Sequence, residues 1–193
     1  MSLKNTDQHT PKRLKLKRAL DRERFAHSLR VEQTALSLAK RYGVDQGQAA
    51  LAALLHDYAR KFDRPGLLKE AKKRKIKIDP ISRLEPKLLH AELSARLAQE
   101  EFGIKDRAVL NAIRKHTLGA PGMSKLEKII FLADHIEEGR DHPGIARVRA
   151  LAAKDLDRAV VAVLTATVQY LLRKELPVHP GGIKTRNYYL LNR

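Results

Sequence analysis

The sequence has no cysteine and no tryptophan, and aromatic residues make up only 5% of its 193 residues. Without cysteine, disulfide bonds and thiolate metal ligands are excluded, so any metal site must use histidine and carboxylate side chains. With so few aromatic residues, the core must be built from leucine, alanine, valine and isoleucine, within a hydrophobic content of 43%. This composition favours a helical bundle over a sheet.

Long apolar runs are also lacking. No stretch approaches the roughly 20 apolar residues that a transmembrane helix needs, and the polar first ten residues lack the apolar core of a signal peptide. We therefore expect a soluble, cytoplasmic protein with no membrane partner. We expect residues 1–10 to be a disordered lead and residues 11–193 to form one helical domain with a C-terminal tail.

Acidic residues are scarce: 22 Asp and Glu stand against 39 Lys and Arg, which gives a formal net charge of +17. A positive field of this strength suits nucleotides, polyphosphates or nucleic acid. Two basic segments, residues 12–18 and 69–77, contribute to it. Each segment is either a solvated helix face or a surface that contacts phosphate or RNA, and the charge alone does not decide.

The spacing of apolar residues predicts helices over residues 11–42, 49–59, 87–102, 106–116 and 124–135, and one or two more over 144–176. Typical caps delimit them: Asp45 and Asp106 as N-caps, a capping box at Ser124, and glycines 43 and 103 as C-terminal stops. Within residues 61–86, Asp79-Pro80 and Glu85-Pro86 are loop signals, and Pro177 with the turn at 179–182 is expected to end the regular structure. Residues 160–164 and 170–172 are expected in the core.

An apolar helix ends in the pair His56 and Asp57. Burying either group without a partner is costly, whereas a metal ion uses a neutral imidazole and an ionised carboxylate as ligands. An isolated pair of this kind is more often a hydrogen-bonded core histidine or a solvated helix end. The interpretation therefore depends on partners elsewhere in the chain.

Such partners stand on the expected inner faces of five successive predicted helices. The inward-facing set comprises His27, His56, Asp57, His90, His116 and Asp134. Six such groups in one small bundle are hard to explain as packing, because each would need its own buried partner. Their chemistry suits two first-row metal ions bridged by a carboxylate, and Fe, Mn, Zn, Co and Ni all fit the nitrogen and oxygen ligands.

The order of these residues resembles the HD-domain superfamily of metal-dependent phosphohydrolases. Within it, four stretches resemble the bacterial YqeK family of symmetrical diadenosine-tetraphosphate (Ap4A) hydrolases: LLHDYAR, LLHAELSARLAQEEFGI, AIRKHTLGAPGMSKLEKIIFLADHIEEGRD and VHPGGIKTRNYYL. The likeness runs in order over roughly residues 20–190. It departs from the common pattern where Arg60 takes the place of a lysine, and where Gly-Gly-Ile-Lys184 replaces a threonine-containing turn.

The resemblance implies an all-α, HD-domain helical bundle with two divalent metal ions, iron being favoured, that splits Ap4A into two ADP. In such a protein His27, His56 and Asp134 would hold one ion, and His90 and His116 the other. Asp57 would bridge the two ions, and a hydroxide between them would attack phosphorus. His56, Asp57 and Arg60 are the expected catalytic residues.

We expect the substrate to be a dinucleoside polyphosphate that contacts Thr117, Gly119, Arg140, Arg186, Asn187 and Tyr188. The remaining histidines at positions 9, 135, 142 and 179 are not expected to be ligands. Two alternatives stay open. One is an HD phosphohydrolase acting on a mononucleotide, a cyclic dinucleotide or ppGpp; the other is a basic RNA- or ribosome-associated binding protein. The sequence leaves the oligomeric state open.

Overall fold

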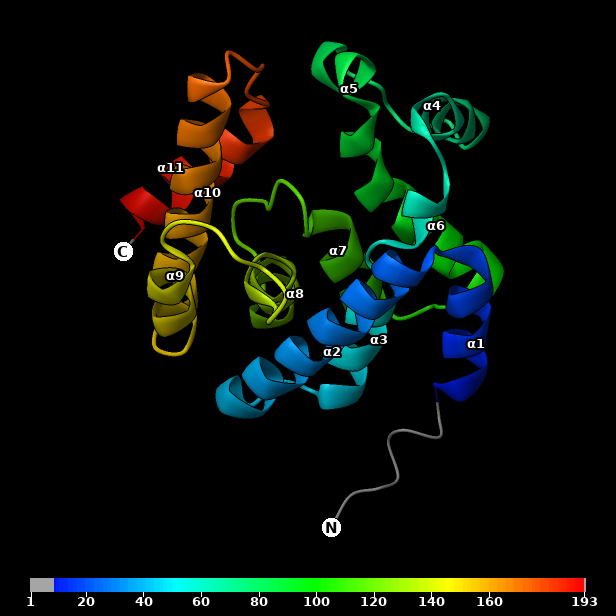
Figure 1. The fold of residues 1–193 in the computed structure, drawn as a ribbon, viewed down its shortest axis with the longest axis horizontal. Helices are drawn as coiled ribbons and strands as arrows, with labels where there is room; N and C mark the ends of the chain where they lie inside the picture. The colour runs from blue at the N-terminus through cyan, green and yellow to red at the C-terminus, as the bar shows by residue number, and fades with distance from the viewer. Residues whose placement is uncertain (1–8, 193) are drawn as a thin grey trace.

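The computed structural model describes residues 9–192, and the regular structure in this range is entirely helical (Figure 1). Its elements are α1 (Thr10–Ala19), α2 (Arg22–Tyr42), α3 (Gln46–Leu55), the 3-10 helix η1 (Tyr58–Lys61), α4 (Arg64–Lys73), α5 (Pro80–Leu84), the 3-10 helix η2 (Pro86–Leu89), α6 (His90–Phe102), α7 (Arg107–Lys115), α8 (Lys125–Ile136), α9 (Ile145–Ala152), α10 (Leu156–Arg173) and α11 (Pro180–Leu191). The expected all-α fold is thus confirmed.

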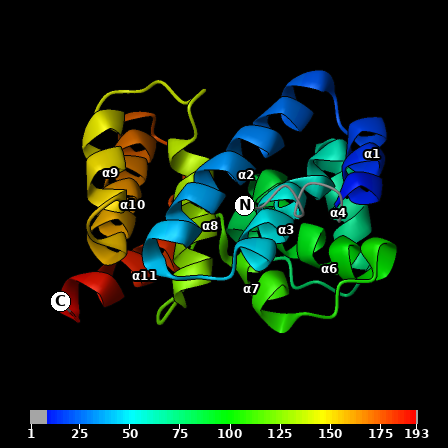
Figure 2. The same cartoon turned by 90° about the horizontal axis from the view of Figure 1, so that it is seen from below.

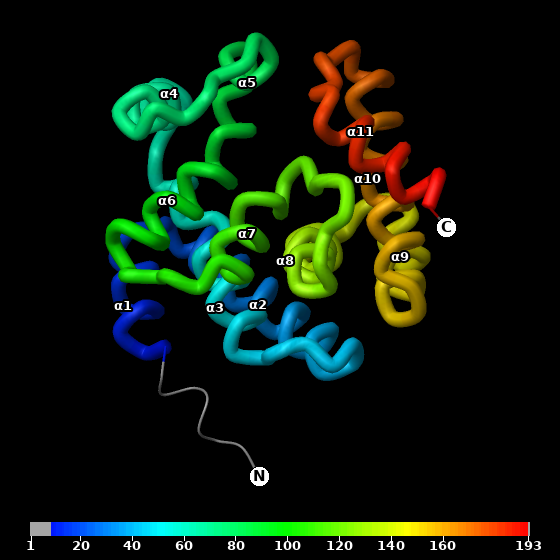
Figure 3. Tube along the Cα trace, turned by 180° about the vertical axis from the view of Figure 1, so that it is seen from behind, coloured from blue at the N-terminus to red at the C-terminus, as the bar shows by residue number. Residues whose placement is uncertain are grey.

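Helix α8 is the centre of the molecule. It packs against α2, α3 and α7 on one side and against α9 and α10 on the other, as Figures 2 and 3 show. Its side chains Ile129, Ile130, Phe131 and Leu132 are fully buried. Most of the other core residues are Leu, Ala, Ile and Val, as the scarcity of aromatic residues requires.

The caps read from the sequence are confirmed. The Asp45 carboxylate accepts a hydrogen bond from the backbone N–H of Gln48, and Asp106 caps α7 in the same way. Ser124 and Glu127 form the capping box that starts α8. Such caps satisfy backbone N–H groups that have no partner within the helix, so they set where the helices that carry the functional residues begin.

The single helix expected over residues 11–42 is wrong. The chain breaks at Leu20, whose backbone is extended, and Asp21 accepts a hydrogen bond from the Arg24 N–H to start α2 as a new helix. The predicted disordered lead includes residue 10, but Thr10 is the first residue of α1. Residues 1–8 of the predicted lead lie outside the described part of the chain.

The loop expected at Asp79-Pro80 and Glu85-Pro86 is also corrected, because α5 and η2 begin there. Asp63 and Asp79 are N-caps, and each is followed within two residues by a proline in the first turn of α4 or α5. An Asp-x-Pro or Asp-Pro sequence therefore marks a helix start here, because proline lacks the N–H that the first turn leaves unpaired. The helix expected over residues 49–59 stops at Leu55, and residues 58–61 form η1.

The C-terminal tail is a helix, contrary to the expected end of regular structure at residues 177–182. His179 caps α11 by accepting from the Gly181 N–H, and Pro180 occupies the first turn. Two consecutive glycines hid this helix because glycine is a poor helix former. The expected core residues at 160–164 are largely buried, but Tyr170 and Leu172 are 51% and 63% exposed, so their assignment to the core is wrong.

None of the helices formed by residues 9–192 combines the length and the apolar character that crossing a membrane requires.

Helix α8 should carry much of the stability. Replacing Ile129, which is 0% exposed, by alanine leaves a cavity in the core and should lower the free energy of unfolding by about 2–5 kcal/mol. The matched control is Leu172→Ala on the exposed face of α10, which should change it by no more than about 0.5 kcal/mol. Equilibrium denaturation by urea measures both, and equal midpoints would contradict the central role of α8.

Candidate metal centre

The ends of helices converge on one point of the structure. His56 directly follows α3, Asp57 precedes η1, His90 joins η2 to α6, and His116 directly follows α7. The two other candidate ligands, His27 and Asp134, project from within α2 and α8. The candidate ligands therefore lie on or next to α2, α3, α6, α7 and α8. These five helices are not successive, contrary to the sequence prediction, because α4 and α5 lie between α3 and α6 in the chain.

The ring orientation of each histidine is set by its Nδ1 atom. In His56, His90 and His116, Nδ1 lies within hydrogen-bond distance of the backbone carbonyl three residues earlier, at 2.6 Å for His56 and 2.7 Å for His116. Each carbonyl lies in the last turn of a helix, and those of Lys87 and Ile113 also accept from the backbone N–H of the histidine itself. A carbonyl oxygen has two lone pairs, so it can accept from Nδ1 as well. A carbonyl only accepts, so Nδ1 carries the proton and Nε2 presents its lone pair inward. The Nδ1 of His27 lies 3.2 Å from the Glu137 carboxylate instead.

A first group of inward atoms forms around Asp134. Its Oδ1 lies 3.1 Å from His27 Nε2 and 3.9 Å from His56 Nε2. The same two nitrogens lie 4.0 Å and 3.9 Å from Asp57 Oδ2. These three ligands from α2, α3 and α8 are close enough together to share one metal ion.

A second group faces the other oxygen of Asp57. Asp57 Oδ1 lies 3.1 Å from His90 Nε2 and 3.7 Å from His116 Nε2, and the two imidazole nitrogens are 2.8 Å apart. Each oxygen of the Asp57 carboxylate therefore faces one pair of histidines. A second set of atoms close enough to share a metal ion comprises His56, Asp57 and His116.

Two of the inward nitrogens have no hydrogen-bond donor among the described residues. They are His27 Nε2 and His56 Nε2, and both are buried. The Nε2 atoms of His90 and His116 face each other and share one hydroxyl, that of Thr117. Buried acceptors without donors are costly, and a divalent cation would remove that cost. The residues present therefore fit a divalent metal site.

The electrostatics of the centre keep the carboxylates ionised and act on the imidazoles in both directions. Burial lowers the pKa of His27 and His116, but the contact of His27 with Asp134 and that of His116 with Asp57 outweigh it and raise both pKa values. Burial raises the pKa of Asp57, but His56 and the other surrounding imidazoles outweigh it and hold that pKa well below its usual range. Burial likewise opposes ionisation of Asp134, but the contact with His27 lowers its pKa further. Complete burial lowers the pKa of His56 to about 4. At neutral pH the set thus offers ionised carboxylates and a neutral His56, the states that ligate metal.

The centre opens into a wide cavity of about 670 Å³. Asp57, His90 and Asp134 form its polar end, and Arg60 and Arg140 flank them. Its far walls are apolar and come from α5 and α10, with Ile81, Leu84, Leu164, Val168 and Leu171. One end of this cavity therefore suits charge and the other suits an apolar ring.

A smaller polar cavity of about 260 Å³ also reaches the centre. It is lined by Asp21, Glu23, Arg24, His27, Arg30, Asp57, Arg60, Glu137, Gly139 and Arg140. Asp57, Arg60 and Arg140 line the wide cavity as well. The candidate metal centre consequently lies where the two cavities meet.

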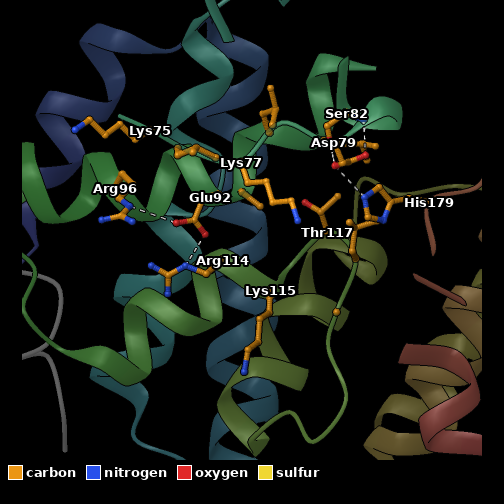
Figure 4. A pocket seen from close by; sticks show the side chains of 16 residues that line it. Lys75, Lys77, Asp79, Ser82, Glu92, Arg96, Arg114, Lys115, Thr117 and His179 are labelled. Carbon is orange, nitrogen blue, oxygen red and sulfur yellow. Dashed lines mark hydrogen bonds and ion pairs between the residues drawn. The ribbon is translucent and has the colours of Figure 1, made fainter. Parts of the chain in front are cut away.

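A third, basic cavity of about 430 Å³ lies beyond Thr117 (Figure 4). Lys77 points toward Thr117 across it, and Glu92 lies between Arg96 and Arg114. The six candidate ligands are absent from its lining. It is thus a neighbour of the metal centre and not part of it.

Comparison with known proteins identifies the family. Residues 24–139 match the HD domain. The chain belongs to the HD family. A protein of Halalkalibacterium halodurans named symmetrical bis(5'-nucleosyl)-tetraphosphatase is 45% identical over 89% of this chain and 91% of its own length. A protein of Bacillus subtilis with the same name is 40% identical over 90% of this chain and 92% of its own length.

A solved structure supports the same assignment. It is described as a predicted HD superfamily hydrolase involved in NAD metabolism from Clostridium acetobutylicum, and it superposes with a TM-score of 0.89 at 35% identity, over 92% of this chain and 94% of that one. The HD assignment, the all-α fold and the resemblance to symmetrical Ap4A hydrolases are thereby confirmed.

Some of the expected substrate residues lie at the HD centre. The Thr117 hydroxyl is 3.2 Å from His90 Nε2 and 3.3 Å from His116 Nε2, and Arg140 donates to Asp134 Oδ1 at 2.8 Å. Gly119 lines the basic cavity with φ +63°, where a Cβ would lie 2.7 Å from the Thr185 methyl group. Only glycine at position 119 therefore allows the loop to pack this closely against α11.

The other expected substrate residues are outside the three cavities described above. Arg186 donates through Nε to the Thr165 hydroxyl at 2.8 Å, which ties α11 to α10. Asn187 accepts from Arg186, and Tyr188 is 36% exposed. Their assignment as substrate contacts stays a prediction that this arrangement does not favour.

Sequence reasoning missed Glu137 as a functional residue. Its carboxylate is almost fully buried and faces His27 Nδ1 while it accepts hydrogen bonds from Arg30 Nε and the Gly139 N–H, both at 2.6 Å. His135 and His179 line the wide cavity, but neither is among the grouped candidate ligands. The burial of Glu137 depends on contact with α2, more than 100 residues earlier, so no local pattern reveals it.

Glu137 should tune the metal affinity of the HD centre. Glu137→Gln removes the charge that orients His27 and holds Arg30, and should weaken binding of Mn²⁺ or Fe²⁺ by about tenfold or more. The control is Glu138→Gln at the exposed neighbouring position, which should bind the metal as tightly as the wild type does. Titration of the metal-free proteins gives the dissociation constants, and identical values for the two variants would refute this role.

Proposed function

We propose that this chain is a metal-dependent hydrolase that cleaves Ap4A symmetrically into two ADP. The observation that carries the proposal is the Asp57 carboxylate, whose two oxygens each face a separate pair of histidines. Relatives that are 37–45% identical over about nine tenths of the chain carry the name of this activity.

The proposal includes two divalent ions, with iron favoured, and a cytoplasmic location. His27, His56 and Asp134 would hold one ion, His90 and His116 the other, and Asp57 both. When bound, such ions lower the pKa of a water molecule that serves as nucleophile and stabilise negative charge on phosphate oxygens. The lone pairs turned inward by the Nδ1 hydrogen bonds support this assignment.

The chain's own residues would position the phosphates. Arg60 and Arg140 stand at the junction of the two cavities, where a planar guanidinium can bind two phosphate oxygens at once. The apolar end of the wide cavity suits a nucleoside, since ligand pockets combine apolar walls with a few polar groups. In the net reaction one water is consumed: its oxygen joins one central phosphorus, and the bridging oxygen leaves with the other ADP.

The alternatives differ in what they would need from the site. Hydrolysis of a mononucleotide, a cyclic dinucleotide or ppGpp would use the same centre, and a substrate panel separates these activities. Binding of RNA would use the two basic segments, residues 12–18 and 69–77, in which Arg13, Lys15 and Arg74 are paired with carboxylates. The binding of RNA at low salt and its loss as salt rises would test this alternative.

The products of Ap4A test the proposal. Protein loaded anaerobically with Fe²⁺ should convert Ap4A to ADP alone, resolved by ion exchange. Asp57→Asn should lower kcat by about a thousandfold, since a misplaced metal pair loses several kcal/mol of transition-state stabilisation. Asp141→Asn, at an exposed position, serves as the matched control. ATP plus AMP as products, or full activity in Asp57→Asn, would disprove the proposal.

A further inference from the structure

The candidate metal centre is open on two sides. Asp57, Arg60 and Arg140 line both the wide cavity and the polar cavity. A dinucleoside tetraphosphate cut at its centre has two nucleotide halves, one on each side of the attacked bond. An HD centre that lies between two cavities can hold such a substrate across its metal ions, with one half in each cavity.

We propose that the polar cavity is the second half-site, which binds one nucleotide of the substrate through its phosphates and ribose while the wide cavity holds the other nucleoside. This inference rests on the proposed function. It goes further than the proposed function because it assigns one nucleotide of the substrate to the polar cavity, whose lining contains no apolar side chain.

Of the four arginines in the polar cavity, Arg24 and Arg60 are held least by other side chains of the described residues. Arg30 is held by Glu137 and Arg140 by Asp134, but among the described residues the Arg60 guanidinium has no hydrogen-bond or ion-pair partner. Within residues 9–192, the one ion pair of Arg24 is with Asp21, at 3.3 Å and with the Asp21 side chain 63% exposed. Surface ion pairs of this kind contribute little, so Arg24 can turn to a bound phosphate.

The wall of the polar cavity is tied to the metal centre. The Arg30 guanidinium packs against the backbone at Gly139, where a Cβ would lie 2.7 Å from Arg30 Nε and would push this flexible side chain aside. Arg30 in turn fixes Glu137 at 2.6 Å, and Glu137 faces His27 of the centre. The cavity and the metal ligands therefore share one network, and a phosphate bound there would have a fixed position relative to the metal ions.

The basic cavity is the rival place for the second half, because Lys77 reaches toward Thr117 within it (Figure 4). However, none of the six candidate ligands lines the basic cavity. The basic cavity adjoins the wide cavity instead, since both are lined by Leu88, Thr117, Leu118 and His179. A phosphate chain that leaves the centre enters the polar cavity directly, past Asp57 and His27. The geometry thus favours the polar cavity.

Arg24→Gln tests the assignment in the metal-loaded enzyme. Loss of a charge-assisted hydrogen bond to phosphate should raise KM for Ap4A by about tenfold, with kcat nearly unchanged. Hydrolysis of bis(p-nitrophenyl) phosphate, which has no second nucleotide, should stay at the wild-type rate. Arg22→Gln removes the same charge from the same exposed turn of α2 outside the cavity, and Lys77→Gln probes the rival; both should keep the wild-type KM.

A wild-type KM for Arg24→Gln, or a rise in KM that appears in Lys77→Gln instead, would overturn the half-site assignment. An equal rise in Arg22→Gln would also overturn it, because the effect would then be one of general charge. If the wild-type protein hydrolyses bis(p-nitrophenyl) phosphate but not Ap4A, the proposed function itself fails. The two failures are therefore distinguishable.

Discussion

The structure depends on one constraint: buried imidazoles must have one nitrogen protonated and bonded while the other points at a common centre. For three histidines the bond partner is the backbone carbonyl three residues earlier, in the last turn of α3, η2 or α7. These helix ends therefore set the orientation of the rings. The caps that fix the beginnings of α3, α7 and α8 serve the same end, because they set the register that brings the ligands together.

This arrangement couples folding to metal binding. Without an ion, four imidazoles and two ionised carboxylates lie close together in the interior. Burying them costs free energy, which the apolar core around α8 must offset. A bound ion satisfies the same atoms, so it stabilises the folded state in proportion to its affinity. Glu137 and Arg30 extend the coupling outward, since they orient His27 and also form the wall of the polar cavity.

The sequence was sufficient to bring the six candidate ligands forward because each interrupts an otherwise apolar helix face or end. It also located the caps of α3, α7 and α8. It failed where a local signal had two meanings: Asp-Pro at residue 79 suggested a loop but starts α5, and the glycines at 181 and 182 hid α11. It failed again at Glu137, whose role depends on contact with α2. The family resemblance drew attention to the tail, but it carried no information on where Arg186 points.

A symmetrical substrate would meet an asymmetrical site. The wide cavity has apolar walls from α5 and α10, whereas the polar cavity has only charged side chains, His27 and Gly139. Attraction between exposed charges weakens as salt is added, and at physiological salt it is largely screened beyond about 8–10 Å. The burial of an apolar ring is not weakened in this way. The two chemically identical halves would thus be held by different forces, one by burial of its base and the other by charge. In that case part of the positive charge of the chain would serve substrate binding, at Arg24 and Arg60.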